Sequence, residues 1–368
     1  MKIICSQERL LKALSVLERV VGKKESLQVL SCVLFDAKKE SLLLQATNLE
    51  TGVETSIPAQ VKEQGRVAIP AKILTQTIKT TTDKEINISL ENDTVRISSK
   101  HTNTIIKTIE KNEFPIIPKT KKGDGKQIQI QTKILIEGIQ AVFYTASQSM
   151  IRPELASIYI YTDDSHLVFA ATDSFRLAEK RVSMGKKIEV PDLLIPSKNA
   201  SDLVHTLLSI ESETVSLLNE ESQLSVEGEN TYFVSRVIDA TFPNYKEIIP
   251  KKHTTEVIAL TEDLKNTFSK ARVFSNTSHQ IGIHVYPKKK MFTITAQNND
   301  VGETADTVEA ALSGEDVDIN FNLSYIAECL QTIHTDSVAL YFNGTGKPLV
   351  IKGVGDTSFV YLVMPLNR

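Results

Sequence analysis

Tryptophan is absent from this 368-residue chain, and aromatic residues make up only 6% of it. A protein that binds single-stranded nucleic acid by stacking bases on aromatic side chains would carry more of them. Neither sign of charge dominates, since 42 Lys and Arg residues stand against 45 Asp and Glu residues and the formal net charge is −3. This balance argues against a uniformly basic nucleic-acid binder, but it allows basic residues to gather on one surface.

Cysteine is also scarce. Cys5, Cys32 and Cys329 are scattered, odd in number and never arranged as CxxC, which argues against a disulfide framework and predicts a reducing compartment. His279 and His284 are five residues apart, so they do not share a helix face, and no third ligand accompanies them. We therefore expect no metal site and no cofactor.

Long apolar runs are missing too. No stretch approaches the roughly 18 apolar residues of a membrane span. Near the N-terminus, Glu8, Arg9 and Lys12 interrupt the segment that a signal peptide would need to keep apolar. These absences predict a soluble, cytoplasmic protein without a membrane partner.

The common catalytic motifs GxSxG, HExxH and GxGxxG do not occur. The segment Asn343-Gly-Thr-Gly-Lys347 lacks the full spacing of a phosphate loop and is followed by Pro348, so a hairpin turn is the better interpretation. Ser183-Met-Gly-Lys186 fits the Ser-x-x-Lys pattern without its companion motifs. An enzyme would need a convergent acid, base or nucleophile set, and we predict no catalytic residue.

What the chain does contain is a threefold repeat with a period near 126 residues. Pro70, Pro196 and Asn322 are 126 residues apart, and each precedes a helical pattern. Three further markers recur in the same order. They are the strand-and-turn segments 44–48, 169–173 and 294–298; the pairs Phe114-Pro115, Phe242-Pro243 and Met364-Pro365; and the apolar stripes Leu10, Leu14, Leu17, Val21, then Leu135, Ile139, Val142, Ala146, then Leu264, Phe268, Ala271, Ser275.

Each repeat is too long for a solenoid unit and is therefore predicted to be a domain. Each is expected to run strand, helix, several strands, helix, several strands, with the second helices over 72–78, 200–208 and 325–333. The polar segments 119–126 and 250–255 separate the repeats. The predicted fold class is α+β, with domains at 1–120, 127–250 and 255–368, each formed by two helices packed on curved antiparallel sheets.

The first predicted helix carries a basic stripe formed by Arg9, Lys12, Arg19 and Lys23. In the third repeat Lys265 and Arg272 are seven residues apart, whereas the middle repeat is poorer in such residues. By composition alone, the stripe fits an ordinary solvated helix face. If the repeats bend into an arc, these faces line its inside and fit a nucleic-acid surface instead.

Three motifs resemble one known family. They are Ala171-Thr-Asp-Ser-Phe-Arg-Leu-Ala178, Phe242-Pro-Asn-Tyr-Lys-Glu-Ile-Ile-Pro250 and Tyr361-Leu-Val-Met-Pro-Leu366. Over essentially its whole length the chain resembles the bacterial DNA polymerase III beta subunits, the sliding clamps. The resemblance implies a non-catalytic ring of two head-to-tail copies, each of them half of the ring, with helices lining the hole.

The resemblance also implies partners: double-stranded DNA without sequence preference, a second copy, the replicative polymerase alpha subunit, the clamp loader complex and other proteins with a clamp-binding peptide. The peptide is short, apolar and Gln-bearing, and it enters a groove between the second and third domains. The groove residues implied here are Leu155, Thr172, Ser174, Phe175, Arg176, Leu177, Pro243, Ile248, Tyr325, Leu362, Val363 and Met364.

Ser174 and Phe175 stand where the family more often has Gly and His, so a more apolar groove floor is expected. Asp173 is expected to hold a turn. Without the resemblance, Leu177 and Met364 would be interpreted as core residues.

Two further sets complete the prediction. The residues expected to face DNA are Arg9, Lys12, Arg19, Lys23, Lys24, Gln148, Lys198, Lys265 and Arg272, of which Lys24, Gln148 and Lys198 follow from the resemblance. The residues expected at the dimer interface are Thr104, Ile106, Val273 and Phe274.

Two other functions stay open on the sequence. One is an enzyme with its site between repeats. The other is a clamp-like scaffold paralogue that binds partner peptides without loading on DNA, which the weakly basic middle repeat allows. Retention on circular DNA distinguishes this scaffold from a clamp.

Overall fold

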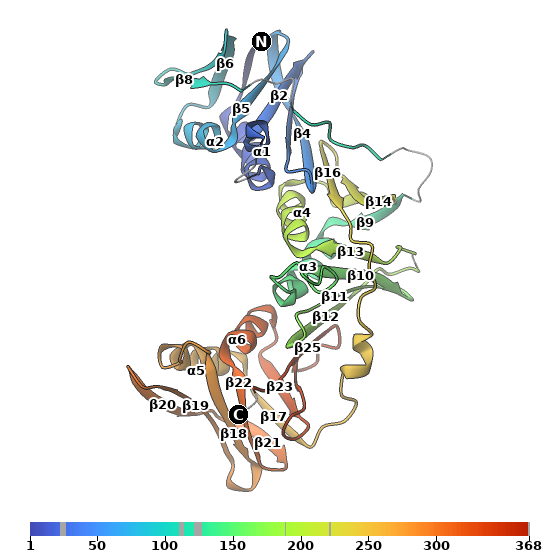
Figure 1. Cartoon of the computed structure of the whole chain (residues 1–368), viewed down its shortest axis with the longest axis vertical. Helices are drawn as coiled ribbons and strands as arrows, with labels where there is room; N and C mark the ends of the chain where they lie inside the picture. The colour runs from blue at the N-terminus through green and yellow to red at the C-terminus, as the bar shows by residue number, and fades with distance from the viewer. Residues whose placement is uncertain (23–26, 110–113, 121–126, 188, 221, 367–368) are drawn as a thin grey trace. The chain divides into compact units, whose positions relative to one another are not determined.

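The computed structural model describes residues 1–22, 27–109, 114–120, 127–187, 189–220 and 222–366 (Figure 1). The chain divides into two compact units. Unit 1 comprises Met1–Ile136 and Lys198–Asp239, and unit 2 comprises Glu137–Ser197 and Ala240–Arg368. Most of the predicted linker 119–126, namely 121–126, lies outside the described residues.

The order of the elements repeats three times along the chain. The first repeat contains β1 (Lys2–Ser6), α1 (Gln7–Val20), η1 (Gln28–Ser31), β2 (Cys32–Lys38), β3 (Ser41–Thr47), β4 (Thr51–Glu63), β5 (Gly65–Pro70), α2 (Ala71–Thr80), β6 (Glu85–Glu91), β7 (Thr94–Ser98) and β8 (Asn103–Lys107). The second contains β9 (Ile128–Gln131), α3 (Thr132–Val142), η3 (Phe143–Thr145), β10 (Ser157–Asp163), β11 (His166–Thr172), β12 (Arg176–Ser183), β13 (Leu193–Pro196), α4 (Ser197–Ser209), β14 (Thr214–Glu220), β15 (Gln223–Glu227), β16 (Thr231–Arg236) and η4 (Tyr245–Ile248). The third contains β17 (Thr255–Leu260), α5 (Thr261–Val273), β18 (Gln280–Tyr286), η5 (Pro287–Lys289), β19 (Met291–Asn298), β20 (Gly302–Thr307), β21 (Ala310–Gly314), β22 (Val317–Asn322), α6 (Leu323–Thr332), β23 (Ser337–Phe342), β24 (Leu349–Gly353) and β25 (Phe359–Val363).

The apolar stripes form the buried faces of the first helices, as the sequence predicted. In α1, Leu10, Leu14 and Leu17 are fully buried, and the Ser6 side chain caps the helix by accepting a hydrogen bond from the backbone N–H of Arg9. The last member of each stripe lies beyond its helix, because α1, α3 and α5 end at Val20, Val142 and Val273. The stripes therefore continue past these ends into the following turns, where helix periodicity no longer applies.

The predicted second helices are confirmed as α2, α4 and α6. The Asn322 side chain caps α6 by accepting hydrogen bonds from the backbone N–H groups of Ser324 and Tyr325. The segment 343–347 is the predicted hairpin turn, since β23 and β24 on either side of it pair antiparallel.

In unit 1, one sheet runs across two repeats. Its order is β8-β7-β6-β1-β4-β16-β15-β14-β9, with β2, β3 and β5 joined beside β4. The strands that join the repeats are β4 and β16, where Val53 pairs with Phe233. The third strand after the first helix of repeat one thus pairs with the last strand of repeat two.

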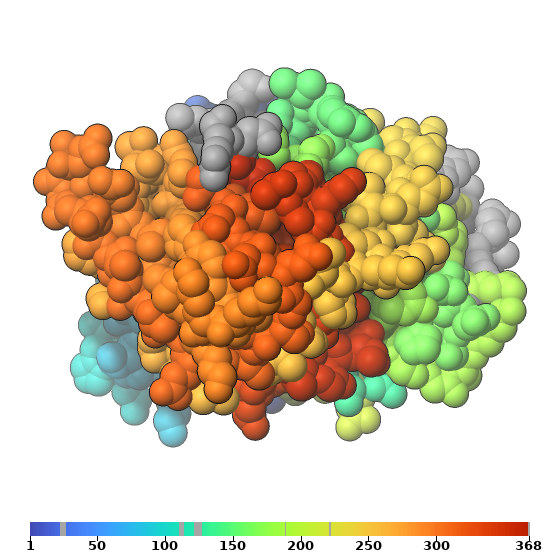
Figure 2. Space-filling view, turned by 90° about the horizontal axis from the view of Figure 1, so that it is seen from below, coloured from blue at the N-terminus to red at the C-terminus, as the bar shows by residue number. Residues whose placement is uncertain are grey.

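Unit 2 contains the same kind of junction. Its larger sheet has the order β13-β10-β11-β12-β25-β24-β23-β17-β21, and a second sheet has the order β20-β19-β18-β22. Here β12 of repeat two pairs with β25 of repeat three, at Leu177 opposite Leu362. In the space-filling view the C-terminal part of the chain, drawn orange to red, is closely packed (Figure 2).

Two strands of this junction pattern have no partner in another repeat within the described part of the chain. In repeat three the third strand after the first helix is β20, and in repeat one the last strand is β8. Within the described part of the chain, β20 pairs only with β19 and β8 pairs only with β7. An unpaired edge exposes backbone N–H and C=O groups that can accept another strand.

Candidate functional site

The predicted groove residues all belong to unit 2, and the β12–β25 junction brings the two main motifs together. Arg176 is opposite Val363 in this pairing. Just beyond the pairing, the backbone N–H of Met364 donates to the backbone oxygen of Phe175 at 2.7 Å. Segments nearly 190 residues apart in the sequence are therefore neighbours at this site.

A tight turn shapes the edge of this site. The Asp173 carboxylate accepts hydrogen bonds from the backbone N–H groups of Phe175 and Arg176 at 2.9 and 3.0 Å, which confirms its structural role. Ser174 has a φ of 77°, a left-handed conformation that favours glycine. The backbone thus adopts at Ser174 a shape suited to the glycine that the resemblance led us to expect there.

The predicted groove residues differ in accessibility. Phe175 is 61% exposed, Ile248 is 56% exposed and Met364 is 39% exposed. Five others are buried and can only support the surface; they are Leu155, Thr172, Leu177, Leu362 and Val363. The apolar surface available to a ligand therefore comes mainly from the first three side chains.

Arg176 connects the second and third repeats beside this surface. Its guanidinium donates to the Asp173 carboxylate at 3.0 Å, to the backbone oxygen of Tyr144 at 2.7 Å and to the Glu328 carboxylate. It also lies 4.2 Å from the ring centroid of Tyr325. Burial alone would lower the pKa of Arg176, but the bond to Glu328 and the nearby negative charges outweigh burial and raise it. Its charge is therefore permanent and its planar group is fixed.

The segment that carries Pro243 is anchored on both sides. The Phe242 ring stacks on Tyr159 with centroids 5.0 Å apart. The Tyr245 hydroxyl donates to the buried Glu179 carboxylate and lies 2.8 Å from the Tyr161 hydroxyl. Burial first, and then the bond to Glu179, raise the pKa of Tyr245. These contacts fix the backbone on which Pro243 and Ile248 stand.

Several predicted DNA-facing residues lie in unit 1. Arg9, Lys12 and Arg19 are exposed on α1, and Lys198 is exposed at the start of α4. Arg19 is close to His205 of α4: burial and then the positive charge of Arg19 lower the pKa of His205. Lys23 and Lys24 lie outside the described residues. The two helices thus share one cationic region.

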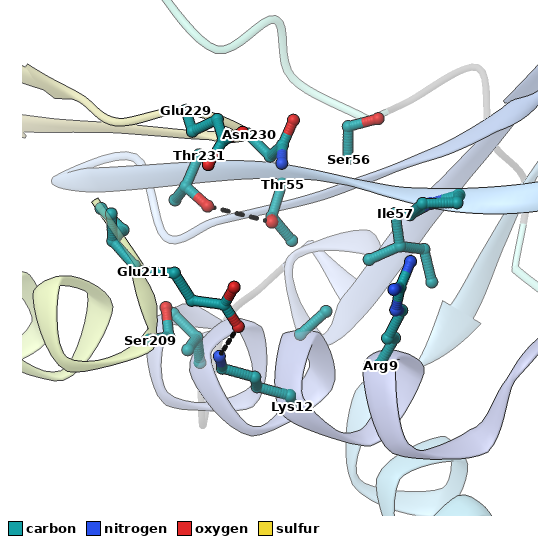
Figure 3. Close-up of a pocket in the computed structure, with 14 residues that line it drawn as sticks. Arg9, Lys12, Thr55, Ser56, Ile57, Ser209, Glu211, Glu229, Asn230 and Thr231 are labelled. Carbon is teal, nitrogen blue, oxygen red and sulfur yellow. Dashed lines mark hydrogen bonds and ion pairs between the residues drawn. The ribbon is translucent and has the colours of Figure 1, made fainter.

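Arg9 and Lys12 also line a pocket of about 280 Å³ in unit 1. Figure 3 shows Lys12 joined to Glu211, which follows α4, while Arg9 lies nearer the N-terminal end of α1. The Lys12–Glu211 distance is 2.8 Å. One predicted DNA-facing lysine is therefore already paired within the chain.

In unit 2 the predicted DNA-facing residues are Gln148, Lys265 and Arg272. Gln148 and Arg272 are exposed, and Lys265 is partly buried. Lys265 pairs with Glu262 at 3.1 Å, whereas Arg272 forms no ion pair with another described residue. The cations thus differ in how available they are to a phosphate.

The predicted interface residues lie in β8 and at the end of α5. In β8, Ile106 is only 4% exposed, whereas Ile105 is 56% exposed. Side chains alternate across a strand, so Ile105 rather than the predicted Ile106 can meet a partner, and Thr104 beside it is partly buried. In unit 2, Val273 is 65% exposed and the Phe274 ring lies beside Gly302 at the start of β20. Each open edge therefore has exposed apolar surface next to it.

The thiols are poor nucleophiles. Burial raises the pKa of Cys5 to about 12 and that of Cys32 to about 11, and it raises the pKa of Cys329 as well. Among the described residues, no group of three His, Cys, Asp or Glu side chains could hold a metal ion, and no helix is long and apolar enough to cross a membrane.

Sequence reasoning missed five residues that shape these surfaces: Tyr144, Tyr161, Glu179, Glu211 and Glu328. Each acts through a contact with a residue distant in the sequence, such as Glu328 with Arg176. No local spacing signals such a contact.

Comparison with known proteins accounts for nearly the whole chain. Three family models match it: the DNA polymerase III beta subunit N-terminal domain at residues 1–118, the central domain at 129–244 and the C-terminal domain at 246–367. The three matched segments follow the three repeats.

Individual relatives agree with these matches. The beta sliding clamp of Vibrio cholerae is 27% identical over 100% of both chains, and that of Synechococcus elongatus is 26% identical over 100% of this chain and 99% of the relative. The crystal structure of the Thermotoga maritima DNA polymerase III beta subunit matches with a TM-score of 0.92 at 25% identity, covering 100% of this chain and 99% of that one. A Pseudomonas aeruginosa sliding clamp bound to griselimycin matches with a TM-score of 0.90 at 23% identity over 100% of both chains.

Proposed function

The chain belongs to the DNA polymerase III beta subunit family, and we propose that it works as a sliding clamp whose two copies close head to tail around duplex DNA. The ring tethers the replicative polymerase through its alpha subunit and is placed on DNA by a clamp loader complex. Other proteins dock through short clamp-binding peptides. We propose no chemical step for the chain itself, and we place it in the cytoplasm.

The observation that carries the proposal is the repeated strand junction. Within the chain, β4 pairs with β16 and β12 pairs with β25, which leaves β20 and β8 as the next members of the series. If β20 of one copy pairs with β8 of a second copy, the same junction occurs at every repeat boundary. Two copies then supply six repeats joined by six equivalent junctions, as expected for a symmetric dimer.

Charge supports the proposed DNA contact. Arg9, Arg19, Lys198 and Arg272 are exposed and form no ion pairs with other described residues. Such cations attract phosphates without reading bases, and this attraction weakens as salt rises. A ring is retained by topology, so weak and mobile contacts suit it better than tight ones.

The exposed apolar side chains of Phe175, Met364 and Ile248 support the proposed peptide groove, and the first two residues are joined by a backbone hydrogen bond. The exposed apolar side chains offer a docking peptide apolar burial, and the fixed Arg176 guanidinium holds the turn that carries Phe175. Phe175 makes this surface more apolar than a histidine would. We propose that griselimycin, which the similar Pseudomonas aeruginosa clamp binds, occupies the same surface in this chain.

Replacing both Arg9 and Arg19 with Gln tests the proposed DNA contact. The variant should bind a short linear duplex more weakly, and the slope of log affinity against log salt should become shallower by up to about 0.9 for each lost phosphate contact. Fluorescence anisotropy with two duplexes of unrelated sequence measures both effects, and the two duplexes should behave alike.

The matched control is Arg66→Gln. Arg66 is a half-exposed arginine of β5 that lies 3.5 Å from Asp36, so its loss should leave DNA affinity unchanged. An equal loss of affinity in the control and in the double variant would contradict the assignment of α1 to DNA.

A further inference from the structure

Lys12 is one of the α1 cations that we propose to face DNA, yet it already forms an ion pair within the chain. Its ammonium lies 2.8 Å from the Glu211 carboxylate, and the side chains are 48% and 83% exposed. Glu211 is the second residue after α4, whose last residue is Ser209. The partial negative charge at the end of this helix adds to the attraction that holds Lys12 in place.

Glu211 lies in the field of two α1 cations. The bond from Lys12, then the charge of Lys12 and then the charge of Arg9 lower the pKa of Glu211, so its carboxylate is ionised at neutral pH. Figure 3 shows the dashed contact between Glu211 and Lys12 on one side of the pocket and Thr55 and Thr231 on the other. The carboxylate thus offers Lys12 the kind of anionic oxygen that a DNA phosphate would offer.

We propose that Glu211 competes with DNA phosphates for Lys12, so that the pocket beside α1 is a phosphate site held closed by the chain's own carboxylate. This inference rests on the proposed sliding-clamp function. A phosphate binds Lys12 only when Glu211 swings away, which the high exposure of both side chains permits. The competition lowers the number of phosphates held at one time, and it thereby favours movement along DNA over tight binding.

Glu211→Gln is the direct test. The substitution keeps the size of the side chain and removes its charge, so it should tighten binding of a short linear duplex about two- to fivefold, the range set by exposed ion pairs. The salt slope should steepen by up to about 0.9, since one more phosphate is neutralised. Fluorescence anisotropy between about 50 and 200 mM salt reports both quantities.

A double-mutant cycle separates the proposed competition from a general change in charge. In a Lys12→Gln background, Glu211→Gln should no longer tighten binding, because the two residues act through one contact. Glu229→Gln is the matched control: Glu229 lines the same pocket and carries the same charge, but it forms no ion pair with another described residue. This control should tighten binding less than Glu211→Gln and should leave the salt slope unchanged.

Three outcomes decide whether Glu211 competes with DNA phosphates for Lys12. Tighter binding that depends on Lys12 supports the competition. Equal tightening by Glu211→Gln and Glu229→Gln, or tightening that persists without Lys12, overturns it. If the unmodified protein binds duplex DNA without any salt dependence, the DNA-facing surface of the proposed function fails instead, whatever Glu211 does.

Discussion

Val273→Asp is expected to leave the chain folded but to turn the proposed dimer into monomers. Val273 is 65% exposed at the end of α5, so the substitution has little effect on the isolated chain. In the closed dimer the same position would be buried beside β8 of a second copy, where an unpaired carboxylate costs several kcal/mol. Because the ring has two such contacts, the dissociation constant should rise at least about 100-fold.

Solution mass measures this effect directly. The chain has a mass of 40.9 kDa, so the unmodified protein should have about twice that mass and the variant should have the chain mass. Ile116→Asp is the matched control, because Ile116 is also highly exposed but lies on neither open strand edge. A Val273→Asp variant that stays dimeric would exclude this position from the interface.

The second large effect is expected at the peptide surface. Met364→Ala should weaken griselimycin binding roughly 30-fold or more, the loss typical of a central apolar anchor worth about 2 kcal/mol. Met364 is partly exposed and follows β25, so its truncation should not disturb the sheet. Isothermal titration calorimetry of the folded dimer gives the affinity.

Val354→Ala controls for the loss of an exposed apolar side chain elsewhere in unit 2. Its affinity for griselimycin should match that of the unmodified protein. Unchanged binding by the Met364→Ala variant would show that the ligand sits elsewhere and would remove the support for the groove. Leu177→Ala is a poorer test, because Leu177 is buried and its truncation risks unfolding.

Much of the fold could be predicted from the sequence, because the regular spacing of apolar residues in each repeat predicts its helices and strands. The stripe Leu10, Leu14 and Leu17 identified α1, and the stretch after Asn322 identified α6. Helix ends were less predictable, since an apolar residue such as Ala146 can be buried in a turn after the helix as well as within it. The division into two compact units could not be predicted, because it follows from strand pairing across repeats.

The candidate site residues also differ in whether the sequence could identify them. Residues inside contiguous motifs, such as Arg176 and Met364, could be named from the sequence because each motif is a local signal. Ile106 was predicted to be at the interface, but it is buried and Ile105 is exposed, because both are apolar and only the sheet register decides which one faces outward. Glu211 and Glu328 were missed because their partners are far away in the sequence.

Retention on circular DNA tests the central claim most directly. The protein, loaded by a clamp loader complex onto a nicked circular duplex, should stay bound through gel filtration and should be lost once a restriction enzyme linearises the circle. A chain that leaves circular and linear DNA equally fast, or stays equally long on both, is not held by encirclement, and that result would contradict the account.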